Sequence, residues 1–192
     1  MKILGIDPDT QASGWAIVTD GPKVLKAGCV NTKHFKVKGL EASVLQGKKL
    51  AQLIGSLSSE IDAVVIESQE KYVNSYRNNV NPNNLITLAY VSGAAVGAAC
   101  GVDHVRLIKP KEWKGGVSKG AMHRRIVNEL EGWSTPDKIA KAVAVTEVYI
   151  DPSLGVEISM DGLIGGGPWS EIMDSIGIAM YGLRYYKAAL CG

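Results

Sequence analysis

The sequence predicts an α/β protein in which helices cover both faces of a five-stranded mixed sheet. Five short apolar runs have the length and flanking turn residues of strands. The first three runs follow one another closely, which favours an antiparallel meander. The later runs alternate with helical segments, which favours parallel pairing through right-handed crossovers. The 192 residues, 46% apolar and 21% charged, suit a single domain over 1–192.

The N-terminal part of the chain contains the predicted meander. Residues 1–7 read MKILGID, an apolar run typical of a buried strand, and the run ends in an acid. A second strand is expected over 13–19. A third is expected over 23–31, where interspersed lysines indicate a half-exposed strand. Gly21 and Pro22 form the turn between these two strands.

A helix over 40–57, a strand over 62–67 and a second helix over 82–101 follow. In the first helix, leucine and isoleucine recur at helical spacing. The strand reads DAVVIE and again ends in an acid. The second helix is rich in glycine and alanine, whose small side chains allow another chain to approach closely. We therefore expect a homodimer that forms through this helix.

The C-terminal half begins with a fifth strand over 102–108 and a loop over 109–116 in which Trp113 is a packing anchor. Helices are expected over 118–131 and 136–150. The stretch 151–168 contains five glycines and is expected to be a loop or an insertion. Ser170 is expected to cap a last helix that ends near residue 190.

The composition indicates where the protein works. Three cysteines, far apart in the chain, predict neither a disulfide framework nor a zinc site, and they favour a reducing, cytoplasmic compartment. No stretch approaches 18 uninterrupted apolar residues, so we expect no membrane span. The acid at position 7 comes before any signal-type apolar region, so we expect no secretory signal.

The charge is unevenly distributed although the net charge is only +2. Residues 23–49 contain seven lysines and one acid, and residues 106–125 contain seven basic residues and one acid. Residues 147–174 contain six acids and no lysine or arginine. Basic strips favour a polyanion through counterion release, and acids beside them repel phosphate unless a cation intervenes. The pattern suggests metal-assisted chemistry on nucleic acid, with solvated faces of opposite charge as the alternative.

Four acids form a candidate metal site. Asp7 and Glu67 end two predicted strands, and parallel neighbours would bring both to the sheet edge where α/β proteins bind ligands. Glu171 and Asp174 lie three residues apart on one face of the last helix. Oxygen donors without histidine or cysteine suit Mg²⁺ or Mn²⁺, and two such ions about 4 Å apart can drive phosphodiester hydrolysis. Taken singly, each acid has another explanation: an acid at a strand end can be a turn residue, and Glu171 and Asp174 can stabilise the helix N-terminus.

Three segments resemble the RuvC family of Holliday-junction resolvases: ILGIDPDTQASGWAIV, AVVIESQ and EIMDSIGIAM. The resemblance implies an RNase H-like fold, a homodimer, dependence on Mg²⁺ or Mn²⁺, and endonucleolytic cleavage of four-way DNA junctions or other branched DNA. It also implies the cytoplasm of a bacterium or of a phage-infected host. It places the catalytic, metal-binding acids on Asp7, Glu67, Glu171 and Asp174. It places Lys119 near the scissile phosphate, with a solvated helix end as the alternative.

The sequence departs from the family pattern at three places. Asp9 stands where the family usually has glycine and adds a charge beside the site. Glu171 has a longer side chain than the aspartate or histidine common at that position. The stretch 151–168 looks like an insertion. These departures resemble phage-type members and bear on junction selectivity more than on the cleavage chemistry.

Two groups of residues are candidates for holding DNA. Tyr72, Tyr76 and Arg77 combine aromatic rings with a cation, as an unstacked base and its phosphate require, although an ordinary exposed loop is the alternative. A second basic group is expected to contact backbone phosphates: Lys111, Lys114, Lys119, Arg124 and Arg125. The three histidines are dispersed, and His123 is expected to face the backbone or solvent.

Two other functions compete with a nuclease. An ATPase or phosphotransferase of the actin-like superfamily would use GIDPDTQASGW and DGLIGGG to bind phosphates, but that group needs two lobes and leaves the basic strips without a role. ATP hydrolysis without DNA would favour it. A non-catalytic protein that binds branched DNA would keep the basic surface without needing the acids. Junction binding without cleavage in Mg²⁺ or Mn²⁺ would favour that reading.

Overall fold

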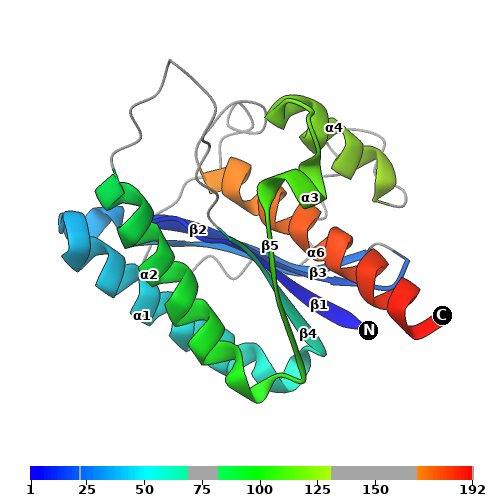
Figure 1. Ribbon diagram of the computed structural model, residues 1–192, viewed down its shortest axis with the longest axis horizontal. Coiled ribbons are helices and arrows are strands. Elements are labelled where there is room, and N and C mark those ends of the chain that lie inside the picture. Colours follow the sequence, from blue (N-terminus) through cyan, green and yellow to red (C-terminus); the bar gives the residue numbers. More distant parts are fainter. Residues whose placement is uncertain (22, 69–81, 131–167, 192) are drawn as a thin grey trace.

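The structure, a computed structural model, describes residues 1–21, 23–68, 82–130 and 168–191 (Figure 1). In these residues the sheet has the order β3-β2-β1-β4-β5. β1 pairs antiparallel with β2, and β2 with β3, whereas β1–β4 and β4–β5 are parallel. The predicted mixed sheet is thereby confirmed. The strands are β1 (Lys2–Asp7), β2 (Ala12–Thr19), β3 (Lys23–Asn31), β4 (Ala63–Glu67) and β5 (His104–Ile108).

Helices cover both faces of this sheet (Figure 1). α1 (Gly39–Leu57) and α2 (Pro82–Ala98) lie on one face. α6 (Pro168–Cys191) crosses the other face, flanked by α3 (Pro110–Lys114) and α4 (Lys119–Glu129). Short 3₁₀ turns occur at η1 (Lys33–Phe35), η2 (Ser58–Glu60) and η3 (Ala99–Gly101).

The central strands are apolar throughout because both of their faces are covered. Successive side chains of a strand point to opposite faces. Ile3 of β1 therefore lies in the core under α6, whereas Leu4 lies in the core under α1 and α2, and both are fully buried. A strand buried on both faces reads as a continuous apolar run, which is why MKILGID and DAVVIE were recognisable in the sequence.

Two glycines let α6 lie close to the sheet. A Cβ atom on Gly5 of β1 would collide with the backbone of Ser175 and Ala179. A Cβ atom on Gly14 of β2 would collide with the backbone carbonyl of Glu171. Because both glycines lack that atom, the first turns of α6 rest directly on β1 and β2. This approach brings the acids of α6 over the carboxyl end of β1.

Two sequence predictions of local structure are wrong. The predicted loop over 109–116 contains the helix α3, because Pro110 suits the first helical position and the Glu112 carboxylate accepts a hydrogen bond from the Lys109 amide at 2.8 Å. The last helix begins at Pro168, so Ser170 lies inside the helix and is buried rather than capping it. The helix predicted over 136–150 and most of the stretch 151–168 fall outside the described residues.

The small-residue helix has one packed face and one open face. Val91, Ala95 and Ala99 are fully buried, and Ala94 packs against Gly47 of α1. Away from these buried residues the helix exposes apolar surface: Ile86 is 63% exposed, and Tyr90, whose ring lies beside Gly47 of α1, is 47% exposed. By length and composition alone, Asn83–Gly101 is apolar enough to cross a membrane, which the sequence analysis did not predict, and 22% of this stretch is buried inside the protein.

Candidate active site

Three carboxylates meet at the carboxyl end of β1. Asp7 is the last residue of that strand, and Glu171 and Asp174 come from the N-terminal part of α6. One oxygen from each lies within 4.8 Å of the others. Asp7 and Asp174 are buried, and Glu171 is half-buried. This spacing allows one cation to contact oxygens from two distant parts of the chain.

Asp7 is surrounded by other negative charges, which disfavour its ionised form. Burial raises the pKa of Asp7 well above its ordinary value, and the carboxylates of Glu67, Asp174 and Glu171 raise it further. Neighbouring carboxylates favour a shared proton or a bound cation, since either one relieves the repulsion. Because the clustered donors are all hard oxygen atoms, the residues fit Mg²⁺ or Mn²⁺.

Asp174 is compensated by two side chains of α4. Lys119 Nζ lies 2.7 Å from Oδ2, and His123 Nε2 lies 2.8 Å from Oδ1. Burial acts to raise the pKa of Asp174, but the contacts with His123 and Lys119 outweigh it and hold this pKa below its ordinary value. Lys119 and His123 therefore favour the ionised form of Asp174, and each contacts one of its two oxygens.

Lys119 spans the acids of α6. Its Nζ lies 3.8 Å from Glu171 Oε1 in addition to its contact with Asp174. Burial acts to lower the pKa of Lys119, but Asp174, Glu171 and Asp7 raise it above the ordinary lysine value. The side chain is 47% exposed, so the charged amine is within reach of both solvent and the acids. Lys119 is the first residue of α4, so this half-exposed helix end also contacts the acids of α6.

Glu67 reaches the same edge from the neighbouring strand. Ile6 pairs with Ile66 across the parallel β1–β4 ladder, which places Glu67 next to Asp7. Glu67 is not one of the three acids whose oxygens lie within 4.8 Å of one another. Its Oε2 accepts a hydrogen bond from Trp113 Nε1 at 2.5 Å and lies 3.6 Å from Lys114 Nζ. Burial raises the pKa of Glu67, and Lys114 and Trp113 act in the opposite direction.

The predicted convergence of four acids is thus realised for three of them, with Glu67 adjacent. Parallel pairing of β1 with β4 accounts for Asp7 and Glu67, and the helical spacing of three residues accounts for Glu171 and Asp174.

His123 was missed by the sequence reading, which expected it to face the backbone or solvent. One sequence feature could have indicated a role for His123: it lies four residues after Lys119, so both side chains share one face of α4. What the sequence lacked was the position of α4 against α6. Trp113, expected to be a packing anchor, is indeed buried, and it also donates the hydrogen bond to Glu67.

The additional acid Asp9 serves the local backbone. Its Oδ1 accepts hydrogen bonds from the Gln11 amide at 2.8 Å and the Ala12 amide at 2.9 Å. A short acidic side chain that hydrogen-bonds its own turn is common where two strands are joined. Asp9 therefore holds the turn that follows Asp7.

Most of the predicted DNA-contacting residues lie on α3 and α4. Lys111, Arg124 and Arg125 are exposed, and Lys114 is half-buried beside Glu67. Lys114 Nζ also lies 4.8 Å from the centre of the Trp113 ring. Tyr72, Tyr76 and Arg77 lie outside the described residues.

Comparison with known proteins relates the chain to solved structures alone. No protein-family profile and no curated protein matches the sequence. A structure of Thermus thermophilus RuvC in complex with Holliday junction substrate superposes with a TM-score of 0.64 at 17% identity, covering 98% of this chain and 96% of that chain. A second structure of Thermus thermophilus RuvC gives a TM-score of 0.53 at 17% identity, covering 98% and 97%. The protein therefore has the RuvC fold, and the expected RNase H-like architecture is confirmed.

Proposed function

We propose that the protein is a divalent-metal-dependent endonuclease that cuts four-way DNA junctions and related branched DNA by hydrolysing phosphodiester bonds. The observation that carries this proposal is the meeting of Asp7, Glu171 and Asp174 at the carboxyl end of β1, within a RuvC fold. Open α/β sheets bind their ligands at this end of the strands.

The acids would hold Mg²⁺ or Mn²⁺, and we expect two ions. Asp7, Glu171 and Asp174 are the proposed shared ligands, and Glu67 is the proposed ligand from the neighbouring strand. Ions bound here would lower the pKa of a water molecule and would stabilise the negative charge that develops on the leaving oxygen. The protein contributes the fixed positions of the carboxylates and a buried setting in which their charge acts strongly.

Lys119 has a separate role in this proposal. Its amine lies among the acids and is charged, and its exposure leaves it accessible to a DNA phosphate. We expect Lys119 to contact the scissile phosphate and to stabilise the charge that develops there during cleavage. His123 would keep Asp174 in place while Lys119 moves from the carboxylate to the phosphate.

The exposed cations of α3 and α4 provide the proposed backbone contacts. Lys111 of α3 and Arg124 and Arg125 of α4 are exposed on the helices that also carry Trp113, Lys119 and His123, and Lys114 lies 3.6 Å from Glu67. Contacts of this kind supply affinity and register without reading base sequence. Tyr72, Tyr76 and Arg77 remain the proposed contacts for the branch point itself.

A homodimer through α2 would provide two such sites for one junction. The open face of α2 exposes Ile86 and Tyr90, and Leu40 of α1 is 58% exposed. Leu40 and Ile86 line the same surface cavity, together with polar residues such as Asn84 and Thr87, so the two exposed apolar side chains lie near each other. Covering this surface with a second copy would remove apolar area from water.

Cleavage of synthetic substrates tests the proposed function. Purified protein is incubated with labelled four-way, three-way, flap and linear duplex DNA, in Mg²⁺, in Mn²⁺ and in EDTA. We expect cleavage of branched substrates in either metal and none in EDTA. Junction binding without cleavage in any metal would instead assign a non-catalytic binding protein, and ATP hydrolysis without DNA would assign the actin-like alternative.

A further inference from the structure

Trp113 connects the helices beside α6 with the acid at the end of β4. Its indole Nε1 donates a 2.5 Å hydrogen bond to Glu67 Oε2, and both side chains are buried. This contact joins residues 46 positions apart in the chain. Tryptophan is a donor through Nε1 alone, so its orientation determines where that N–H can act.

The backbone brings Trp113 to Glu67 by a short route. Glu67 pairs with Ile108 at the end of the parallel β4–β5 ladder, and the Ser68 amide donates to the Ile108 carbonyl at 2.7 Å. Lys109 then leads directly into α3, which starts at Pro110 and has Trp113 on its buried face. The helix that the sequence did not predict is therefore what carries the indole to the carboxylate.

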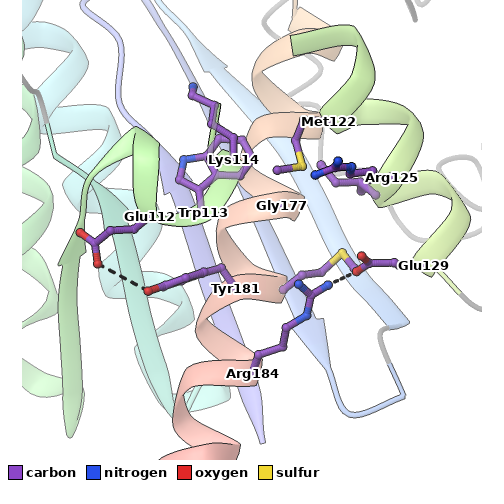
Figure 2. Close-up of a pocket in the computed structure, with 12 residues that line it drawn as sticks. Glu112, Trp113, Lys114, Met122, Arg125, Glu129, Gly177, Tyr181 and Arg184 are labelled. Carbon is purple, nitrogen blue, oxygen red and sulfur yellow. Dashed lines mark hydrogen bonds and ion pairs between the residues drawn. The ribbon is translucent and has the colours of Figure 1, made fainter. Parts of the chain in front are cut away.

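Packing against α6 holds the indole in place. Figure 2 shows Trp113 lying beside Gly177 of α6. A Cβ atom on Gly177 would come within 2.5 Å of the Trp113 ring and 2.8 Å of Ile126 Cδ1, so the absence of a side chain at this position makes room for the ring. One part of the indole also borders a cavity of about 300 Å³ between α3, α4 and α6. The ring is thus fixed by α6 while its N–H faces the acid.

Trp113 and Lys114 both act on one oxygen of Glu67. Lys114 Nζ lies 3.6 Å from Oε2, the atom that accepts the indole hydrogen bond. A hydrogen bond to a charged acceptor is stronger than one between neutral groups and fixes the orientation of the acceptor. With Oε2 held in this way, Oε1 is the oxygen that we expect to face the other acids.

We propose that Trp113 is a positioning residue that orients the Glu67 carboxylate for metal binding through its indole N–H. This inference rests on the proposed function, because it concerns the metal that the acids would hold. Residues that hydrogen-bond a metal ligand commonly contribute about 10- to 100-fold to metal affinity. A structural role for the ring alone would require its volume and not its N–H.

The test compares Trp113→Phe with wild type, because phenylalanine keeps an aromatic ring against Gly177 and removes the donor. Metal affinity is measured by calorimetric titration with Mn²⁺, and folding is checked by the melting temperature without metal. Trp15→Phe is the matched control, since Trp15 is also buried but lies in the core on the α1 and α2 face. We expect Trp113→Phe to weaken Mn²⁺ binding about 10-fold or more and Trp15→Phe to leave it unchanged.

A double-mutant cycle shows whether Trp113 acts through Glu67. In the Glu67→Gln background the additional effect of Trp113→Phe on Mn²⁺ affinity should largely disappear, because the carboxylate that the indole orients is gone. An effect of the same size in both backgrounds would overturn the proposal. So would an unchanged Mn²⁺ affinity in Trp113→Phe alone.

If Trp113→Phe folds poorly, the indole N–H signal of wild-type protein tests the same proposal. In a ¹H–¹⁵N spectrum, the indole signal that shifts in Glu67→Gln is assigned to Trp113. That signal should move when Mg²⁺ is added, and a signal that stays still would overturn the proposal. If wild-type protein binds metal and cleaves junctions, and Trp113→Phe binds metal with the same affinity, the role of Trp113 is overturned and the proposed function stands. Wild-type protein that binds no metal would overturn both.

Discussion

His123 Nε2 lies 2.8 Å from Asp174 Oδ1, which joins α4 to α6 at the acid cluster. Lys119, one turn earlier on α4, occupies the other oxygen of the same carboxylate. Of the two buried acids of the cluster, Asp174 is therefore the one whose charge is compensated by side chains of α4. At Asp7, by contrast, burial raises the pKa well above its ordinary value, and the carboxylates of Glu67, Asp174 and Glu171 raise it further.

His123→Ala should destabilise the fold at neutral pH by about 1–3 kcal/mol, because a buried charged acceptor loses a donor. The pKa of Asp174 is depressed in the folded state, so its stabilisation is present above the ordinary value of 3.8 and is lost as the pH falls through the lower folded value. The difference in the free energy of unfolding between variant and wild type should therefore shrink below about pH 4. Urea unfolding at pH 7 and at pH 3 measures this free energy, and Arg124→Ala, at an exposed position, is the control. A free-energy difference that does not change with pH would contradict this explanation.

Asp7→Asn should abolish cleavage while junction binding survives or tightens, since repulsion of the DNA phosphate is relieved. The same variant should melt at a higher temperature than wild type without metal. A raised carboxyl pKa means that the folded state holds the proton more tightly, so wild-type stability falls as the pH rises above the ordinary aspartate range. The gain from Asp7→Asn should grow as the pH rises above the ordinary value of 3.8 and level off once the pH has passed the raised folded-state value. Loss of junction binding would show instead that Asp7 has a structural role.

Mg²⁺ or Mn²⁺ should raise the melting temperature of wild-type protein, and EDTA should reverse the change. A ligand that binds only the folded state stabilises it by about 2.7 kcal/mol at 100 times its dissociation constant. Asp174→Asn should lose most of this response, because a neutral amide is a poorer ligand for a divalent cation. An equal metal response in Asp174→Asn and wild type would place the ion elsewhere.

Gly14→Ala should destabilise the protein by about 1–3 kcal/mol, as expected for overpacking. The added methyl group would meet the Glu171 carbonyl, so α6 must move away from β2. Because α6 carries two of the three clustered acids, metal affinity should fall together with stability. Gly55→Ala is the matched control: Gly55 lies in α1 with no atom near its Cβ position, and alanine is favoured there by about 1 kcal/mol. Calorimetric melting and metal titration compare the two variants.

Ile86→Lys should convert the proposed homodimer into a monomer. A lysine on the open face of α2 places a charge where the dimer would bury apolar surface, next to Tyr90 on the following turn. Light scattering coupled to size-exclusion chromatography measures the mass of wild type and variant. The metal-induced change in melting temperature should be kept, because α2 lies on the opposite face of the sheet from α6. Wild-type protein that is monomeric at all concentrations would rule out this interface.

The sheet was predictable because its signals are local. A strand buried on both faces must be apolar at every position, so 1–7 and 62–67 were identified in the sequence together with the acids that end them. The short distances between the first three strands left an antiparallel meander as the simplest arrangement. The positions of Asp7 and Glu67 on adjacent strands followed from the strand–helix–strand order. The spacing of Glu171 and Asp174 followed from the period of a helix.

Contacts between elements distant in the chain required the tertiary structure. Nothing local to α4 indicates that His123 meets Asp174, since that contact depends on how two helices pack. Nothing local to 109–116 indicates that Trp113 holds Glu67, because the capping that makes α3 helical competes with glycine-rich loop signals on its C-terminal side. Residue type and spacing determined which acids and which strands this protein has. The close packing of α6 over Gly5 and Gly14 decided which side chains surround those acids, because only side-chain volumes in three dimensions set how near two elements can come.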